Sequence, residues 1–542
     1  MKKLVSMCLA LILLLGMTTA LADDAKTTLN VTLIQQAVAI SPTEMQFLTD
    51  LCEEANVEVK WKTYTSQTWQ EVKNVILATP DELPDIFIGA ITKSDFATYN
   101  YYFIPLEGLI EKCGPHITAM FEAYPDTKTF ATELDGSIYG LPTRWAFRPA
   151  THRKWYINQV WLNNLGLEIP TTFDELYDVL KAFKEQDANG NGNPNDEIPF
   201  IIPNSFNFFM THMTRMMGAY GNYSDIQTTS SKDGQFVYLP ATEDFRDTIA
   251  FVHKLYADGL LYEESLTLDY STWSSLARDP ESENCGCTIA WSANEFAGSM
   301  YDSQFVCMDQ IAATKDIQPV SSNTPYNSLT YKGHGAQITT VCKNPEAAMR
   351  FLDLWYKEIY SVQAYFGSIG TALEQNADGT YTFIVPEGYG VEEWQRINAV
   401  IDTGLYYISD ELQSRLIVPK AFTQVVDDEA VISKRVAEAD GNAFYFVKLD
   451  PEDNAEAAII LNDLQTITST YMADWVVNGI AEGAWEEYVK NLEKAQMKDY
   501  LAIYQNAYDE FDHFVLQNNP KALMANAYLL FSGNLPRDFA RA

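Results

Sequence analysis

VEVKWKTYTSQTWQEVKNVILATPDELPDIFIG, residues 57–89, contains the pattern of a strand, a helix and a second strand in that order. Its first five residues alternate apolar and polar side chains, as half-buried strands do. Residues 69–78 predict a short helix with Val72, Val75 and Ile76 on one face. The final PDIFIG is an apolar run closed by glycine, which is typical of a buried parallel strand. The segment therefore predicts a β-α-β unit within an α/β fold, whose sites lie at the ends of parallel strands.

The same alternation of strands and helices continues on both sides of this unit. Residues 29–34 alternate as an earlier strand. A Thr172–Glu175 capping box starts a helix near residue 172. The apolar stripe of that helix consists of Phe173, Leu176, Leu180 and Phe183. The chain has 542 residues, of which 47% are hydrophobic, so it is long enough for two large lobes with buried cores.

Charge and motif content exclude several classes of function. Lys and Arg number 37 against 73 Asp and Glu, a net charge of −36, so nucleic acid is not expected as a partner. The sequence contains no G-x-S-x-G elbow, H-E-x-x-H motif, phosphate loop or dinucleotide fingerprint. A pair of carboxylates for glycoside hydrolysis remains open, because acidic residues are abundant.

Residues 1–22 have the features of a signal peptide. Lys2 and Lys3 precede an apolar run over residues 4–17, and Ala-Leu-Ala at residues 20–22 fits a cleavage site. We expect cleavage after Ala22 and export to the periplasm or the cell exterior. Cys8 lies before most of the apolar run, a position that fits lipidation badly, so a lipoprotein is not indicated.

Several motifs occur in a characteristic order between residues 83 and 489. They are LPDI (83–86), PLEGLI (105–110), DGSIYGLP (135–142), INQVWLNNLGL (157–167), PTTFDEL (170–176), KNPEAAMRFLD (343–353), VNG (477–479) and WEEYV (485–489). In this order they resemble the family-1 extracellular solute-binding proteins of bacterial ABC importers. The similarity is greatest to the subgroup of LplA-like and alginate-oligosaccharide-binding proteins.

This resemblance implies a two-lobed periplasmic-binding-protein-like fold of type II, with a ligand cleft between lobes that short hinge crossings connect. We assign residues 23–147 and 288–340 to lobe I, the N-terminal lobe. Residues 148–287 and 341–542 are assigned to lobe II, the C-terminal lobe. Crossings are expected near residues 142–151, 285–294 and 335–343.

The resemblance also implies a function without covalent chemistry. The protein is expected to capture a carbohydrate, an oligosaccharide in particular, and to close its lobes around it. It would then deliver this ligand, as a monomer, to the permease subunits of an ABC transporter. Two alternatives are a secreted glycoside hydrolase and a carrier of a peptide or another polar solute on the same fold.

Aromatic and polar residues near the expected crossings are the candidate ligand-binding residues. Sugars stack their C–H faces on aromatic rings, while their hydroxyl groups need polar partners. The candidates are Arg144, Trp145 and Arg148, followed in the chain by His152, Arg153 and Lys154; then Trp291 and Asn294; and also Tyr64 and Trp273. The alternative for the first group is a salt bridge between the lobes, with Trp145 packed in the hinge.

Residues 187–197, DANGNGNPNDE, predict a structural calcium site. Oxygen-bearing side chains at alternate positions, with glycines between them, suit a hard cation. The loop begins like an EF-hand, but Ile198 stands at position 12, where a glutamate is needed. The expected ligands are Asp187, Asn189, Asn191 and the carbonyl of Asn193, with Asp196 or Glu197 closing the site. The alternative is a polar Asn-Gly turn without an ion.

Overall fold

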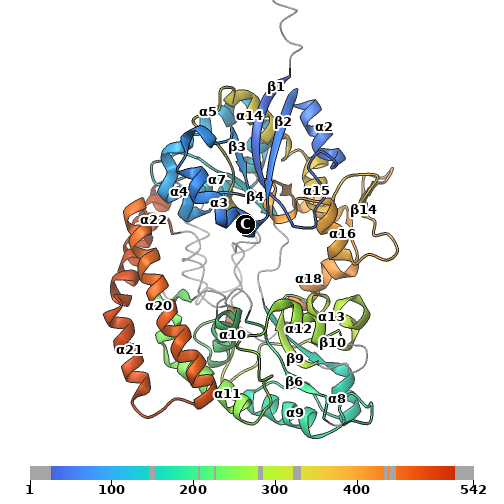
Figure 1. Ribbon diagram of the computed structural model, residues 1–542, viewed down its shortest axis with the longest axis vertical. Helices are drawn as coiled ribbons and strands as arrows, with labels where there is room; N and C mark the ends of the chain where they lie inside the picture. Colours follow the sequence, from blue (N-terminus) through green and yellow to red (C-terminus); the bar gives the residue numbers. More distant parts are fainter. Residues whose placement is uncertain are drawn as a thin grey trace, which may run out of the picture.

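The computed structural model describes residues 26–145, 153–193, 195–204, 208–224, 228–232, 234–278, 285–321, 331–432, 437–438 and 447–518. Two α/β lobes lie one above the other, which confirms the predicted fold class (Figure 1). The predicted signal peptide, its cleavage site and Arg148 lie outside the described residues. Within the described part, no helix is both long enough and apolar enough to cross a membrane.

Lobe I is built on a six-stranded sheet with the order β15-β4-β12-β3-β1-β2. Its strands are β1 (Thr27–Ile34), β2 (Val57–Tyr64), β3 (Ile86–Ile88), β4 (Leu141–Trp145), β12 (Tyr331–Ile338) and β15 (Tyr407–Ile408). β1 lies between β2 and β3 and pairs in parallel with both, so the two strands predicted within residues 57–89 are parallel but are not direct neighbours. β12 runs antiparallel to β3 and to β4, so β3 and β4 point in the same direction.

Helices cover both faces of this sheet (Figure 1). They are α2 (Gln46–Glu54), α3 (Ser66–Leu77), α4 (Lys93–Tyr99), α5 (Glu107–Cys113), α6 (Pro115–Ala123), α7 (Pro125–Ala131), α14 (Pro345–Leu354), α15 (Glu358–Phe366) and α16 (Val391–Asn398). In α3 the buried face differs from the predicted one, because Val75 is 65% exposed while Trp69 and Ile76 are buried. Trp69 sets this rotation, since its indole Nε1 donates a hydrogen bond to the Ala90 carbonyl at 2.7 Å.

Lobe II is built on a four-stranded sheet with the order β10-β5-β9-β6. The strands are β5 (Lys154–Asn158), β6 (Ile198–Phe200), β9 (Cys285–Ala290) and β10 (Phe305–Cys307). Its helices are α8 (Gln159–Leu165), α9 (Phe173–Glu185), α10 (Phe208–Met216), α11 (Glu243–Ala257), α12 (Tyr270–Leu276) and α13 (Ala293–Tyr301). The stripe predicted for α9 is confirmed, because all four of its apolar residues are buried in the lobe II core.

The C-terminal helices connect the two lobes along one flank (Figure 1). They are α20 (Pro451–Asn478), α21 (Ala484–Lys494) and α22 (Met497–Asn518). α18 (Lys420–Ile432) lies apart from this flank, near α13 of lobe II. α20 contacts α4 of lobe I and also packs along α11 of lobe II. Before α20, Lys448 donates a hydrogen bond to the Thr132 carbonyl of lobe I. This flank is therefore a structural link between the lobes in addition to the hinge crossings.

Two segments lie in a different lobe from the one that the sequence predicted. β9, α13 and β10 belong to lobe II, because β9 and β10 pair with β5 on its two sides. Residues 345–408 belong to lobe I, where α14 and α15 pack into its core and β15 pairs with β4. Trp145 ends a strand of lobe I and Lys154 begins a strand of lobe II, close to the first predicted crossing, and Tyr331 begins a strand of lobe I again. The segments 285–294 and 335–343 are not crossings, since they belong to β9 and the turn after it and to β12 and the turn after it.

Candidate functional site

The edge of lobe I that borders lobe II is set by the direction of its parallel strands. β1, β2, β3 and β4 point the same way, so their carboxyl ends lie at one edge of the sheet. Trp145 ends β4, and from there the chain leaves for lobe II. Tyr64 ends β2 and therefore lies at the same edge, half-buried against Trp69 with ring centroids 5.3 Å apart.

The facing edge of lobe II is set by the antiparallel pairing of β5 and β9. Lys154, where the chain enters the lobe, pairs with Ala290 at the end of β9. Trp291 follows directly and is half-buried. Tyr64 and Trp291, two of the predicted ligand-binding residues, thus lie at the two sheet edges between which the chain crosses. Polar strand ends of this kind are where open α/β sheets bind ligands.

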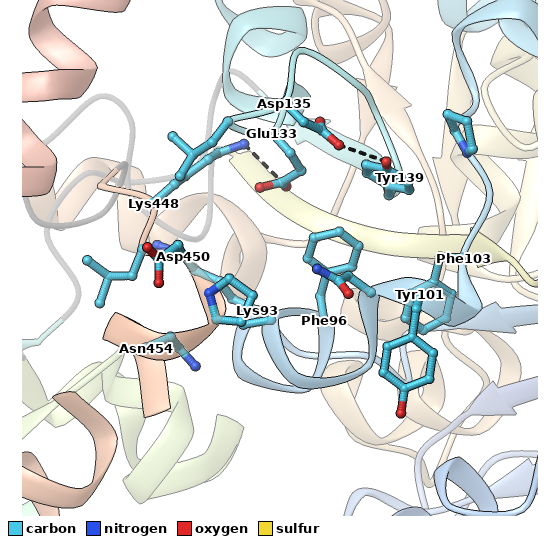
Figure 2. A pocket seen from close by; sticks show the side chains of 16 residues that line it. Lys93, Phe96, Tyr101, Phe103, Glu133, Asp135, Tyr139, Lys448, Asp450 and Asn454 are labelled. Carbon is cyan, nitrogen blue, oxygen red and sulfur yellow. Dashed lines mark hydrogen bonds and ion pairs between the residues drawn. The ribbon is translucent and has the colours of Figure 1, made fainter. Parts of the chain in front are cut away.

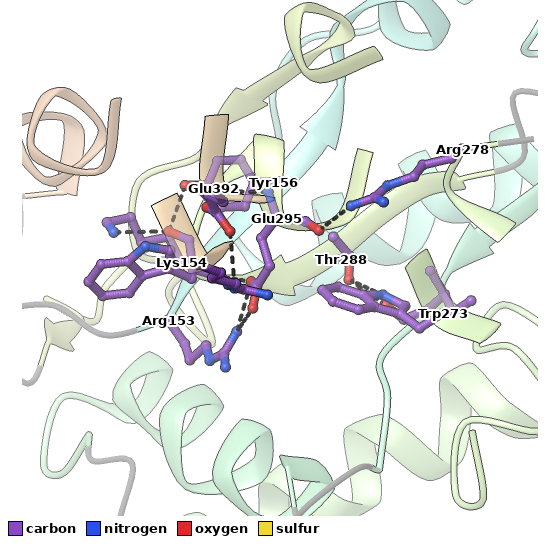
Figure 3. A network of polar contacts seen from close by, with 12 residues as sticks. Arg153, Lys154, Tyr156, Trp273, Arg278, Thr288, Glu295 and Glu392 are labelled. Atoms are coloured by element: carbon purple, nitrogen blue, oxygen red, sulfur yellow. Dashed lines mark hydrogen bonds and ion pairs between the residues drawn. The ribbon is translucent and has the colours of Figure 1, made fainter. Parts of the chain in front are cut away.

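A network of polar contacts fixes the backbone of Trp291 (Figure 3). Its N–H donates to Glu295 Oε2 at 2.7 Å, and its carbonyl accepts from Lys154 Nζ at 3.3 Å and from the Tyr156 hydroxyl at 3.2 Å. Arg153 in turn holds both oxygens of Glu295 at 3.1 and 2.9 Å. The three hydrogen bonds to Trp291 all involve its backbone, and none involves its indole.

The ring of Trp291 has a buried cation beside it. Lys154 Nζ lies 5.0 Å from the ring centroid, and burial lowers the pKa of Lys154 to about 8. The neighbouring Tyr156 hydroxyl donates to Asp428 Oδ2 of α18 at 2.7 Å, and burial raises the pKa of Asp428. At this edge of lobe II the half-buried Trp291 ring therefore lies beside a buried polar cluster of Lys154, Tyr156 and Asp428, and the ring suits a ligand with apolar faces.

Three other predicted ligand-binding residues are enclosed by protein. Trp145 is only 7% exposed: its ring packs edge-to-face on Tyr365 at 4.5 Å, and its Nε1 donates to Gln413 at 2.6 Å. The Arg144 guanidinium lies 4.1 Å from the centroid of the Tyr124 ring. Trp273 is 1% exposed in the lobe II core. For these three the packing interpretation describes the structure better than a ligand contact.

Two predicted ligand-binding residues remain, Asn294 and Arg148, and the structure describes only the first of them. Asn294 lies on α13, where its amide donates to Asp302 Oδ2 at 3.0 Å. Arg148 is not among the described residues. Arg153 and Lys154 were expected only as basic neighbours of the first crossing, and no role in positioning Trp291 was predicted for them. Asp428 had no signal, because only folding brings it to Tyr156, which is 272 positions away in the chain.

The predicted calcium loop is curled by hydrogen bonds to its own side chains. Asn189 Oδ1 accepts from the N–H of Asn191, and Asp187 Oδ2 accepts from the N–H of Gly192, both at 2.9 Å. The amides of Asn189 and Asn191 donate to the two oxygens of Asp196 at 3.2 and 2.7 Å. Among the described residues, no three His, Cys, Asp or Glu side chains are grouped as metal ligands.

Two carboxylate oxygens of this loop are buried without a hydrogen-bond partner, Oδ1 of Asp187 and Oε2 of Glu197. Burial also raises the pKa of Glu197. An unpartnered buried carboxylate is costly unless a cation compensates for it. The loop therefore fits a cation, and the orphaned oxygens favour Glu197 over Asp196 as the residue that closes the site.

Comparison with known proteins identifies the family. Residues 39–359, more than half of the chain, match the family model described as bacterial extracellular solute-binding protein. The chain belongs to this family. The resemblance in the motifs between residues 83 and 489 is thereby confirmed.

Individual relatives of this solute-binding protein agree with the family match. FusA of Streptococcus pneumoniae serotype 4, a fructooligosaccharide ABC transporter substrate-binding protein, is 28% identical over 494 residues, which cover 87% of this chain and 88% of FusA. The polygalacturonan/rhamnogalacturonan-binding protein YtcQ of Bacillus subtilis is 23% identical over 398 residues, 70% of this chain and 71% of YtcQ.

Solved structures show the same architecture. FusA in complex with kestose superposes with a TM-score of 0.78 at 25% identity, covering 90% of this chain and all of FusA. An EF-hand mutant of FusA has been solved with fructo-nystose. The alginate-binding protein AlgQ2, solved without calcium ion, gives a TM-score of 0.67 at 22% identity over 90% of this chain and 98% of AlgQ2.

Proposed function

We propose that this protein captures an oligosaccharide between its two lobes and delivers it to the permease subunits of an ABC importer. The observation that carries the proposal is the position of Tyr64 and Trp291 at the facing edges of lobe I and lobe II. A ligand that touches both edges binds the closed arrangement better than the open one, so it shifts the population toward closure. The closed protein is then the form that the transporter recognises.

The chemistry around Trp291 supports a carbohydrate as the ligand. A ring can stack on the C–H face of a sugar, and the half-buried Trp291 ring lies at the edge of lobe II beside the buried Lys154 ammonium group. FusA and YtcQ, which both align over most of this chain, are carbohydrate-binding proteins by name. We infer the same class of ligand here, carried by an exported protein that works as a monomer.

The hydrolase alternative requires two carboxyl groups about 5–10 Å apart that flank the sugar bond. Glu295, the carboxylate nearest in the chain to Trp291, is held by Arg153 and by the Trp291 N–H. These bonds give it a positioning role. We therefore favour transport over hydrolysis at this site.

Thermal unfolding with a glycan panel tests the proposal. A ligand that binds only the folded protein raises its melting temperature, and saturation at a hundred times Kd stabilises it by about 2.7 kcal/mol. We expect a rise with at least one oligosaccharide among fructans, pectin fragments and alginate fragments, measured by scanning fluorimetry, and no rise with peptides. Two results would contradict the proposal: peptides alone stabilise the protein, or the purified protein releases reducing ends with turnover.

We also propose that the loop at residues 187–197 holds calcium in a structural role, with Asp187, Asn189, Asn191, Asn193 and Glu197 as ligands. Bound calcium supplies positive charge to Asp187 Oδ1 and Glu197 Oε2, the two buried oxygens without partners. The loop follows α9, and its Ala188 N–H donates to Glu197 Oε1 at 2.9 Å, so the ion would tie the end of α9 to the start of β6.

Removing calcium is expected to lower the melting temperature by several degrees, because two buried carboxylates then lose their compensating charge. Glu197→Gln should abolish this sensitivity to chelator. Asp196→Asn is the matched control and should retain it, since the Asp196 oxygens are engaged by the amides of Asn189 and Asn191. Scanning calorimetry with and without chelator measures both. Equal melting curves for the unsubstituted protein under the two conditions would refute the calcium site.

A further inference from the structure

A cavity of about 410 Å³ lies where lobe I meets the start of α20 (Figure 2). Its walls come from α4, from residues 100–105 that follow it, from the turn at residues 133–139 and from the start of α20. Phe103 at its floor pairs with Thr339, just beyond the end of β12 that is remote from lobe II. The cavity is thus separate from the site between the lobes.

Aromatic rings form much of the lining. Phe96 lies near the middle of the lining residues in Figure 2 and packs on Tyr139, with ring centroids 5.4 Å apart. Phe103 is buried beside Phe96, and the two rings are stacked at 5.9 Å. Tyr101, also in the lining, is 63% exposed. These rings offer apolar faces to whatever enters the cavity.

Polar groups without partners lie beside these rings. The half-exposed side-chain amides of Asn100 and Asn454 line the cavity and make no hydrogen bond within the described part of the chain. The Asp135 carboxylate accepts from the Tyr139 hydroxyl at 2.8 Å and from the N–H of Ser137 at 2.9 Å, which fixes its position in the wall. An apolar ligand would desolvate these groups without replacing their hydrogen bonds to water, which is unfavourable.

Charges of both signs occur in the lining, and the two cations are already engaged. Lys448 Nζ lies 3.3 Å from Glu133 Oε1, and Lys93 donates to the Val447 carbonyl. Asp135 and Asp450 add negative charge, so an anionic ligand meets carboxylates and a cationic one meets two ammonium groups. The ligand that fits aromatic faces, free amides and a wall of mixed charge is neutral and rich in hydroxyl groups.

We infer that this cavity is an accessory site for a neutral sugar unit, occupied independently of the site between the lobes. Its volume falls within the range of about 300–1,000 Å³ typical of small-molecule sites. Tyr101 would stack on the sugar face, and the amides of Asn100 and Asn454 would pair with hydroxyl groups. A longer glycan could then touch the protein at a second place on lobe I.

Saturation-transfer NMR with kestose, maltotriose and cellotriose as probes tests this site on the full chain. The inter-lobe site is first weakened by Tyr64→Ala together with Trp291→Ala. In this background we expect saturable binding of at least one probe at millimolar concentration. Adding Tyr101→Ala and Asn454→Ala should weaken that binding at least tenfold, whereas Tyr389→Ala, which removes another exposed ring of lobe I, should leave it unchanged.

Two outcomes would overturn the inference: no probe binds in the weakened background, or the residual binding survives the cavity substitutions. If the combined cavity variant melts earlier than its parent, Asn454→Leu alone replaces it, since this half-exposed residue lies in the first turn of α20. The proposed transport function is tested separately: a probe should bind to the unsubstituted protein, and Trp291→Ala should remove this binding. The two claims therefore fail on different variants.

Discussion

Trp145→Ala is expected to destabilise the protein by about 3–5 kcal/mol, the usual cost of truncating a buried tryptophan. Tyr365, Phe366 and Tyr406 surround the ring with centroid distances of 4.5, 6.0 and 6.5 Å. The substitution leaves a cavity in this aromatic cluster and also removes the hydrogen bond from Nε1 to Gln413. Because β4 ends at Trp145, the damage falls where the chain leaves lobe I. Urea unfolding followed by circular dichroism measures the loss.

Trp145→Phe is the matched control, since it keeps an aromatic ring and loses mainly volume and one hydrogen bond. It should recover more than half of the lost stability. If Trp145→Ala instead unfolds like the unsubstituted protein while its ligand affinity drops, Trp145 contacts ligand and its packing is incidental. A variant that is both destabilised and normal in affinity identifies the ring as hinge core.

The parallel unit of lobe I was predictable because its signals are local. Alternation in residues 57–61 and the apolar run at residues 84–89 each specify a strand within a few positions, and the intervening helix predicts that the two strands run parallel. The pairing of both strands with β1, which lies between them, was not specified by this segment. The sequence did not predict correctly which face of the intervening helix is buried. Val75 belongs to the same sequence stripe as Ile76, yet the indole of Trp69 reaches the Ala90 carbonyl and turns Val75 to solvent.

The division into lobes could not be predicted, because it depends on pairing between distant segments. β9 reads like any buried strand, and only its pairing with β5, more than 120 positions earlier, assigns it to lobe II. In the same way, residues 407–408 join lobe I through β4. The lobe to which a strand belongs depends on the sheet edge with which it pairs in the folded chain. Neither composition nor hydrophobic periodicity contains this information.

Only part of the candidate site was predictable, because contacts between distant segments also decide which of its residues are buried. Trp145 ends β4 and Trp291 follows β9, and the two look alike in the sequence. Folding brings Tyr365 and Tyr406 against the ring of Trp145, which is 7% exposed, whereas Trp291 stays half-buried. In the proposed calcium loop the oxygen-bearing side chains lie within eleven residues, so their pattern was visible in the sequence. The choice between Asp196 and Glu197 depended on which carboxylate the asparagine amides engage.

Trp291→Ala is expected to weaken oligosaccharide binding tenfold to a hundredfold while leaving the fold intact. Loss of a stacking ring costs roughly 1–3 kcal/mol of binding free energy. The fold should survive, because Glu295, Lys154 and Tyr156 hold the backbone of residue 291 and none of these three hydrogen bonds involves the indole. Titration calorimetry with the glycan that gives the largest thermal shift measures the affinity, with kestose as the first probe.

The matched control is Trp273→Ala in the same lobe. Trp273 is buried and donates to Thr288 Oγ1 at 3.2 Å, so its loss should lower the melting temperature and leave the affinity of the folded fraction unchanged. Tyr64→Ala, at the facing edge of lobe I, should weaken the same ligand without destabilising the protein. A loss of affinity on both edges is what a ligand bridging two lobes requires, because closure depends on contacts to both. If Tyr64→Ala and Trp291→Ala both bind normally, the ligand does not lie between these edges and the proposed capture site is wrong.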